Sequence, residues 1–514
     1  MDNFTRGWHG LAIAWCLVAV PLWIGFFQGK AAIRQWLLSP IIAAVLLFVG
    51  GLVVAILEES LKPGVVVNVI LTLICLSGIG YAGGRYLTGW LSIGSEAHKR
   101  GTLLKEGSRL KGQRNGVLTL AGVAVEPEDE TKHFKLIGTT GTGKSTAIRE
   151  LVGAALERGD RAIVADPDGG YLARFYQPYR GDTVLNPFNP DSVKWDPFAE
   201  IKDPYDVEQL AGALIPTGEE GAGREWRGYA RTFATAVIRH CYQAGKRDLT
   251  ELWRLLTAAS SEELRPIVAG TPAQPFLEPD SARMFSNIRS VTGSAIAALE
   301  YIQVQRAAAF SVREWVRSGR GVLFVPYQAA QIAALRSVIA AWIRIAIVEA
   351  MSRPEGDQRL WFVIDELDAL GTIDGLKDAL ARLRKFGGRC VLGFQSIAQV
   401  SSTYGVGEAQ TIVENCGSTL ILRCSGSEGG GTSRFASHLI GDREIVRAEV
   451  SRGHSHSSLF SSSSSSHVSE SVTHRHVTEA AVMASEIEQL PDLTGFLKLA
   501  SSPTWMRIAF APRP

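Results

Sequence analysis

The chain has 514 residues, a formal net charge of +2 and a hydrophobic content of 46%. This length is enough for two to four domains, and the balanced charge argues against a protein that binds nucleic acid through its overall charge. The six cysteines are scattered without a CxxC pair, which argues against a disulfide framework or a zinc site and fits a soluble part in the reducing cytosol.

The first 90 residues differ in kind from the rest of the chain. Apolar stretches at residues 8–27, 36–57 and 65–81 are each long enough, at about 1.5 Å per residue, to cross a hydrocarbon core of about 30 Å. More apolar stretches follow the first one, so we interpret them as membrane helices rather than a signal peptide. The third stretch contains Asn68 and also fits an interfacial helix, which leaves two or three spans.

Charges beside these stretches predict their orientation. The positive residues are Lys30 and Arg34 in the first loop and, after the third stretch, Arg85, Lys99, Arg100, Lys105 and Arg109. Three spans would place the first loop and the large C-terminal part on the cytoplasmic side, and two spans would also leave the N-terminus there. We therefore expect a multi-pass anchor with the bulk of the chain in the cytoplasm.

Residues 138–146 have the composition and spacing of a phosphate-binding loop between an apolar run and a helical pattern. Glycines let backbone N–H groups approach phosphates, Lys144 supplies a cation, and Ser145 supplies a hydroxyl for Mg²⁺. The residues predicted to bind ATP are Gly138, Thr139, Thr140, Gly141, Thr142, Gly143, Lys144, Ser145 and Thr146. The alternative is a glycine-rich turn with a solvated lysine.

A second strand, residues 161–165, follows the helix after the loop and ends in Asp166-Pro-Asp168-Gly169. A strand, a helix and a strand in this order predict a parallel α/β unit. Asp166 and Asp168 are weak candidates for the magnesium shell, because Asp and Gly are also common in turns.

Residues 196–305 change to helical patterns with Gly and Pro breaks, which predict an all-α insertion inside the α/β domain. Its functional interpretation is a subdomain that faces the substrate, and the alternative is a structural lid. The candidate phosphate contacts, which are also ordinary solvated arginines in the alternative interpretation, are Arg224, Arg227, Arg231, Arg283 and Arg289.

The α/β pattern returns after residue 306, and the strand at residues 360–364 delivers Asp365 and Glu366 at its carboxyl end. In a P-loop ATPase Asp365 would hold the water shell of Mg²⁺, and Glu366 would polarise the attacking water. The alternative is an acidic surface turn.

Two further candidates follow the acidic pair. Gln395 ends the next strand, residues 390–394, beside the acidic strand, where it is placed to sense the γ-phosphate. Arg384 lies on the preceding helix, residues 374–386, and would act across a subunit boundary on the charge of the transition state. The alternative for Arg384 is an ordinary solvent-exposed arginine.

The C-terminal part contains a segment dominated by Ser and His, residues 451–476, which we expect to be a mobile loop rather than a metal site. Residues 495–500 and 505–510 have the pattern of a closing β-hairpin.

Together these motifs resemble the coupling proteins of type IV secretion systems, the TraD-like conjugation ATPases. The segments that carry the resemblance are Gly138-Thr-Thr-Gly-Thr-Gly-Lys-Ser145, Asp166-Pro-Asp-Gly169, Asn186-Pro-Phe188, Trp195-Asp-Pro197, Val363-Ile-Asp-Glu-Leu367, Gly393-Phe-Gln-Ser396 and Ala484-Ser-Glu-Ile-Glu-Gln-Leu-Pro491. Lys144, Ser145, Asp365, Glu366 and Gln395 match the family's nucleotide site.

The resemblance implies a bacterial inner-membrane anchor, a RecA-like motor that forms a homo-hexamer around DNA, and partners in a relaxase and a secretion channel. It also implies that Arg384 is the arginine that acts in trans and that binding of single-stranded DNA is independent of sequence. Many members have two membrane helices, whereas this chain has three apolar stretches.

The expected organisation is an anchor at 1–90, a RecA-like P-loop ATPase domain at 91–195 and 306–514, and the all-α insertion at 196–305. The expected function is an ATP- and Mg²⁺-dependent DNA pump. One alternative is an adaptor that recruits protein substrates and uses nucleotide as a switch. Another is an FtsK-like DNA translocase, although the sequence has neither a long linker nor a C-terminal winged helix.

Overall fold

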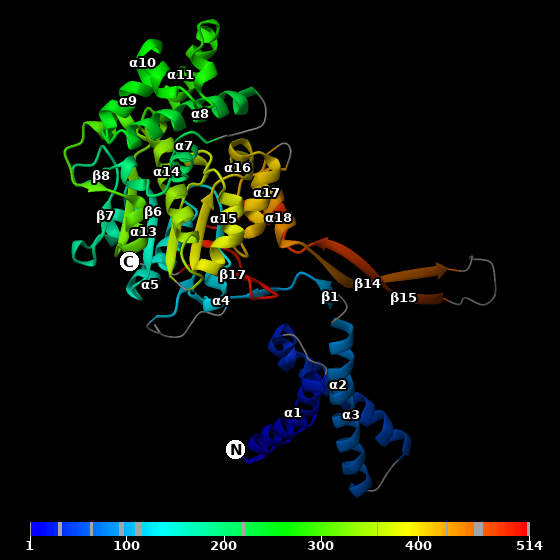
Figure 1. Ribbon diagram of the computed structural model, residues 1–514. Helices are drawn as coiled ribbons and strands as arrows, with labels where there is room; N and C mark the ends of the chain where they lie inside the picture. Colours follow the sequence, from blue (N-terminus) through cyan, green and yellow to red (C-terminus); the bar gives the residue numbers. More distant parts are fainter. Residues whose placement is uncertain are drawn as a thin grey trace. The chain divides into compact units, whose positions relative to one another are not determined.

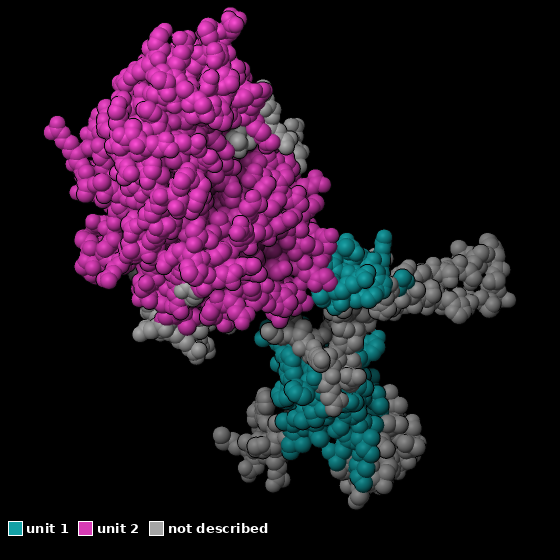
Figure 2. Space-filling model, viewed as in Figure 1, with its two compact units in different colours: residues 1–100, 443–479 teal, residues 101–442, 480–514 magenta. Residues whose placement is uncertain are grey.

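The computed structural model describes residues 2–28, 33–61, 65–91, 97–107, 116–216, 222–356, 358–427, 430–456 and 466–510. Two compact units divide the chain, as Figure 2 shows. The first contains residues 1–100 and 443–479, and the second contains residues 101–442 and 480–514.

Three helices form the N-terminal part of the first unit: α1 (Asp2–Gln28), α2 (Ile33–Leu61) and α3 (Val65–Leu91). Among the described residues, Trp36–Ala55 in α2 is long and apolar enough to cross a membrane, whereas the apolar segments Ile13–Phe27 and Thr72–Gly84 are shorter. The three apolar stretches are therefore helical, and the number of membrane spans stays a prediction.

Within the described residues, the second unit is built on a sheet of ten strands in the order β2-β17-β16-β13-β5-β12-β11-β6-β10-β7. In that order the strands are Leu104–Glu106, Trp505–Ala509, Thr494–Lys498, Ser418–Ile421, Phe134–Ile137, Gly388–Phe394, Leu360–Ile364, Arg161–Pro167, Val322–Tyr327 and Thr183–Val184. The strands from β13 to β7 are parallel, so the segments that follow them meet at one edge of the sheet.

Alternating apolar side chains give this sheet a core on each face. In β6, Ile163 and Ala165 belong to one core, and Ala162 and Val164 belong to the other. Helix α5 (Lys144–Glu157) packs into the second core, and α14 (Ile332–Met351) packs into the first. The strand that carries the acidic pair is buried along its whole length, as its continuous apolar sequence predicts.

Within its described residues, the insertion consists of helices joined by turns and loops. Its helices are α7 (Asp206–Leu214), α8 (Ala222–Gln243), α9 (Leu249–Thr257), α10 (Ser261–Val268), α11 (Ala282–Ile296) and α12 (Leu299–Gln303). Figure 1 shows α8, α9, α10 and α11 gathered at one end of the unit. Strands β8 (Lys194–Trp195) and β9 (Ala309–Phe310) pair with each other, so the chain leaves and re-enters the α/β domain side by side.

The expectation of a mobile loop at residues 451–476 is wrong for its described part. Strands β14 (Asp442–His456) and β15 (Ser466–Ala480) form a three-stranded sheet with β1 (Ala97–Gly101), and residues 457–465 lie outside the described residues. Backbone hydrogen bonds between strands require no apolar side chains, so a Ser- and His-rich composition did not reveal this pairing. The predicted C-terminal hairpin is confirmed as β16 and β17.

His133 stands immediately before β5 and is buried, at 1% exposure. Its Nε2 lies 2.8 Å from the carbonyl oxygen of Leu380, and its Nδ1 accepts the N–H of Cys390 at 3.1 Å. An Nδ1 that accepts a hydrogen bond requires a neutral ring. Burial accordingly lowers the pKa of His133 from 6.5 to about 4.

This lowered pKa predicts a loss of stability in acid. As the pH falls from about 6.5 to 4, His133 becomes protonated in the unfolded chain but stays neutral in the folded chain. This difference lowers the free energy of unfolding by up to the order of 3 kcal/mol. Thermal unfolding midpoints of the full chain should fall less steeply over this window in His133→Gln than in the wild type. Parallel curves for the two proteins would contradict this account.

Candidate nucleotide site

The predicted phosphate-binding loop connects β5 to α5. Lys144, the first residue of α5, is 6% exposed, and its Nζ donates to the carbonyl oxygens of Gly138 at 2.5 Å and Thr139 at 3.3 Å. Burial lowers the pKa of Lys144, and the carboxylates of Asp365 and Glu366 oppose that shift. A lysine held inside its own loop carries its charge toward the space that the loop encloses.

The acidic pair follows β11 at the same edge of the sheet. Asp365 is 3% exposed, and its Oδ2 accepts the hydroxyl of Ser145 at 2.6 Å. The predicted magnesium pair, which is separated by 220 residues in sequence, is therefore in direct contact. A hydroxyl and a carboxylate oxygen are ligands that Mg²⁺ prefers.

Gln395 joins the loop to the acidic pair. It accepts the hydroxyl of Thr140 at 3.0 Å, and its Nε2 donates to Oε1 of Glu366 at 3.0 Å. The sheet order explains this contact, because β12 lies between β5 and β11 and delivers Gln395 between the two motifs. Burial raises the pKa of the Glu366 carboxyl, and the hydrogen bond from Gln395 opposes the shift.

Gly393 permits this close arrangement. A Cβ at this position would overlap the backbone carbonyl oxygen of Asp365 and lie 3.1 Å from its Oδ1. The carbonyl of Gly393 also accepts the N–H of Leu367 at 2.9 Å, which fixes the turn after the acidic pair. Any side chain at residue 393 would therefore displace Asp365.

Asp166 holds the start of a helix, and Asp168 lies in a turn. Asp166 is fully buried, and its carboxylate accepts the N–H groups of Tyr171 and Leu172 at the start of α6 (Gly170–Phe175). Burial raises its pKa to about 6. Asp168 is exposed with a φ of 60°, as in a turn. The sequence missed Tyr171, whose hydroxyl contacts Asp365, because no local pattern links residues this far apart.

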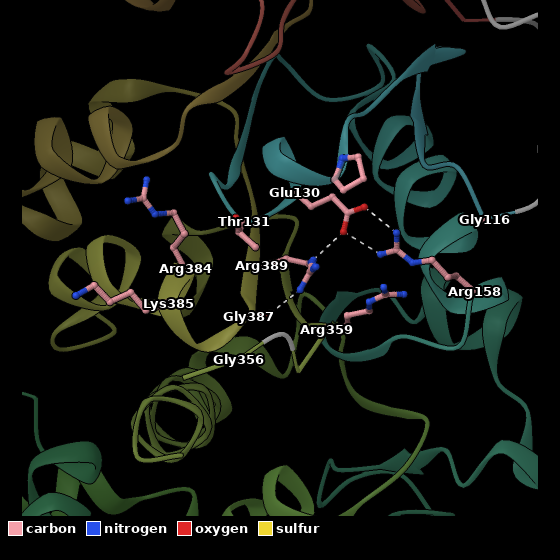
Figure 3. Close-up of a pocket in the computed structure, with 11 residues that line it drawn as sticks. Gly116, Glu130, Thr131, Arg158, Gly356, Arg359, Arg384, Lys385, Gly387 and Arg389 are labelled. Atoms are coloured by element: carbon pink, nitrogen blue, oxygen red, sulfur yellow. Dashed lines mark hydrogen bonds and ion pairs between the residues drawn. The ribbon is translucent and has the colours of Figure 1, made fainter. Parts of the chain in front are cut away.

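Arg384 is not brought together with these residues. It starts a 3₁₀ turn (Arg384–Phe386) before β12, whereas Gln395 follows β12, so the length of the strand, about 20 Å, separates them. Arg384 lines a pocket of about 460 Å³ with Lys385, Arg359, Arg158 and Arg389. In Figure 3 Glu130 bonds to Arg158 and Arg389, while Arg384 and Lys385 extend away from that cluster.

The arginines of the insertion separate into two groups. Arg231 donates to the carbonyl of Ile215 and to Asp374, and Arg289 donates to the carbonyl of Ala259. Arg224, Arg227 and Arg283 are exposed, and of these Arg227 donates to the carbonyl of Pro216 at 3.3 Å. Arg227 also lines a cavity of about 810 Å³ that α11, α14 and the turn around Asp368 share.

The residues of the loop and the acidic pair fit a nucleotide with its magnesium ion. This cofactor needs a cation for its phosphates, oxygen ligands for its metal ion and a carboxylate near the attacking water. The chain offers a buried ammonium group, a hydroxyl bonded to a carboxylate, and a second carboxylate bonded to a glutamine. The buried hydroxyl of Tyr327, at the end of β10, makes no hydrogen bond in the described part of the chain, and after burial the charges of Glu366 and Asp365 raise its pKa further.

A family model of the type IV secretion-system coupling protein DNA-binding domain matches residues 117–511. The coupling protein TraD of Escherichia coli (strain K12) is 29% identical over 397 residues, which are 76% of this chain and 54% of TraD. A conjugal transfer protein TraG of Escherichia coli is 22% identical over 365 residues, 62% of this chain and 56% of TraG. The chain thus spans about half the length of these relatives.

Solved structures of the plasmid coupling protein TrwB are similar over most of the chain. The complex of TrwB with ADP and Mg²⁺ matches with a TM-score of 0.71 and 29% identity, over 82% of this chain and 96% of that one. The complex with the non-hydrolysable ATP analogue ADPNP gives a TM-score of 0.70 at 29% identity, over 81% and 95%. The predicted P-loop α/β domain with an all-α insertion is therefore confirmed.

The bridge through Gln395 generates a prediction. Gln395→Ala frees Glu366 from its hydrogen bond, so the maximal rate of ATP hydrolysis should fall at least about 10-fold. Binding of a non-hydrolysable ATP analogue should change less than about threefold, because Lys144 keeps its contacts. The matched control is Gln399→Ala, which removes an exposed glutamine of α16 (Ile397–Tyr404). An unchanged rate in Gln395→Ala would contradict the bridging role.

Proposed function

Because the family model covers most of its length, the chain belongs to the type IV secretion-system coupling proteins, and from this premise we propose that it is a membrane-anchored, ATP-hydrolysing motor that moves DNA into a type IV secretion channel. The observation that carries the proposal is the hydrogen-bonded series Thr140, Gln395 and Glu366 beside the Ser145–Asp365 pair. A protein that only binds nucleotide does not need a carboxylate poised beside the magnesium pair.

Each residue of the site has a role in this proposal. ATP with Mg²⁺ supplies the phosphoanhydride bond and a divalent charge when bound, and Ser145 and Asp365 would hold the ion. Lys144 would bind the β- and γ-phosphates. Glu366 would accept a proton from the attacking water, a task that its raised pKa favours. Gln395 would sense the γ-phosphate, because it contacts both the phosphate-binding loop and Glu366.

DNA is the proposed substrate, bound through its backbone without regard to sequence. The family model is described as a DNA-binding domain, which supports this part of the proposal. Of the predicted phosphate contacts, Arg224, Arg227 and Arg283 are exposed. Arg231 and Arg289 are partly buried as well as bonded to backbone carbonyl groups, and they are weaker candidates.

The proposed location is the bacterial inner membrane, with α1, α2 and α3 as a multi-pass anchor and the ATPase in the cytoplasm. The apolar segment Trp36–Ala55 supports an anchor. A relaxase bound to its DNA and the channel proteins are the proposed partners, in line with the coupling and transfer functions named for the relatives TraD and TraG.

The proposed assembly is a homo-hexamer in which Arg384 acts on the nucleotide of a neighbouring copy. Arg384 and the loop of its own chain lie at opposite ends of β12, which supports action in trans rather than in cis. Arg384 is exposed and has no hydrogen-bond or ion-pair partner among the described residues, so its guanidinium is available to a neighbour.

The full chain in lipid nanodiscs should hydrolyse ATP faster with single-stranded DNA, and this stimulation should weaken steeply with salt. An ATPase rate that does not change with DNA under ring-forming conditions would remove the main support for a pump.

The variant Lys144→Ala should lower the rate of hydrolysis at least about 100-fold and abolish conjugative transfer with normal membrane insertion. If Glu366→Gln stops hydrolysis but transfer continues, the chain is a nucleotide-switched adaptor instead.

Mixed assemblies test the role of Arg384. Arg384→Ala chains keep an intact phosphate-binding loop, and Lys144→Ala chains keep an intact arginine, so each alone should be inactive. Mixed together they should regain hydrolysis at interfaces where the two intact parts meet. The matched control, Arg382→Ala, removes an exposed arginine of the same helical segment and should stay active. Failure of the mixture to regain any activity would contradict action in trans.

A further inference from the structure

The hydroxyl of Tyr171 contacts Asp365, the carboxylate that would hold Mg²⁺. Tyr171 is 1% exposed, and its hydroxyl donates to Oδ2 of Asp365 at 2.8 Å. Ser145 donates to the same oxygen at 2.6 Å. The other oxygen, Oδ1, accepts no hydrogen bond from the described residues, so the two hydroxyls fix one oxygen and leave the second for an ion or its water.

The Asp-Pro-Asp-Gly motif holds Tyr171 in this position. Asp166 accepts the N–H of Tyr171 at 3.0 Å and the N–H of Leu172 at 2.7 Å, which anchors the first turn of α6. The guanidinium of Arg149 lies 5.5 Å from the centre of the Tyr171 ring and restricts its movement. Asp166 thereby binds the backbone of α6, and its hydrogen-bonded link to Asp365 runs through Tyr171.

We propose that Tyr171 is a positioning residue for the divalent cation, and that Asp166 acts through it by fixing the helix that carries its hydroxyl. The proposal rests on the nucleotide site described above and assigns a function to the Asp-Pro-Asp-Gly motif within it. A carboxylate with one oxygen pinned by two donors presents the other in a fixed direction. Without Tyr171, only Ser145 restrains Asp365, and the carboxylate rotates.

Tyr171→Phe tests the proposal, because it removes the hydroxyl and keeps the buried ring. Binding of Mn²⁺, used in place of Mg²⁺ and followed by electron paramagnetic resonance, should weaken about 10-fold in the full chain loaded with ADPNP. Binding of ADPNP in the presence of EDTA should stay within about twofold of the wild type. In hydrolysis assays the Mg²⁺ concentration for half-maximal rate should rise about 10-fold, while the rate at saturating Mg²⁺ stays within about threefold.

The matched control is Tyr176→Phe. Tyr176 stands at the other end of α6 and is 42% exposed, and its hydroxyl makes no hydrogen bond in the described part of the chain. This variant should bind Mn²⁺ as the wild type does. Asp166→Asn is a second test, since it offers one acceptor oxygen instead of two to the N–H groups of α6 and should weaken Mn²⁺ binding in the same direction.

Unchanged Mn²⁺ binding in Tyr171→Phe would overturn the proposal. A lower rate at saturating Mg²⁺ with an unchanged half-saturation would also overturn it, because Tyr171 would then act on the chemical step or only on the fold. The Mn²⁺ measurement needs neither DNA nor hydrolysis, so it separates this proposal from the proposed motor function. If ADPNP fails to bind the wild-type chain, the nucleotide site itself is wrong.

Discussion

The position of β12 between β5 and β11 is the constraint on which the site depends. Because this strand separates the phosphate-binding loop from the acidic pair, the residue that follows it, Gln395, reaches both. The strand can lie this close to Asp365 only without a side chain at residue 393. The order of the strands and the glycine at residue 393 together allow Gln395 to connect Glu366 to the phosphate-binding loop.

Buried charge adds to this constraint. Lys144 and Asp365 are buried and Glu366 is half-buried, and these charged groups would be costly without partners. The loop carbonyls, the Ser145 and Tyr171 hydroxyls and the Gln395 amide supply those partners. These hydrogen bonds hold the side chains in place through contacts within the chain, which would lower the reorganisation that the proposed hydrolysis requires.

The sequence was sufficient for the parts of the site that lie in short segments. A phosphate-binding loop and a buried strand ending in Asp365 and Glu366 have fixed residue types, and the structure brings both together as expected. The contact of Tyr171 with Asp365 joins residues 194 apart and has no local pattern, so it required coordinates. Composition misled at β14 and β15, because strand pairing satisfies the backbone whatever the side chains are.

The proposed catalytic residues lie at both edges of the parallel sheet. The edge where the strands end holds Asp365 and Glu366 and the proposed triphosphate, and the edge where β12 begins holds Arg384 among other cations. In the proposed assembly, a second copy presents Arg384 to the transferring phosphoryl group, in addition to Lys144 of the chain that binds the nucleotide. Contact between two different surfaces is heterologous, and such contacts close only as a ring or continue as a filament. The proposed hexamer is the closed ring, and in it each nucleotide would contact two chains.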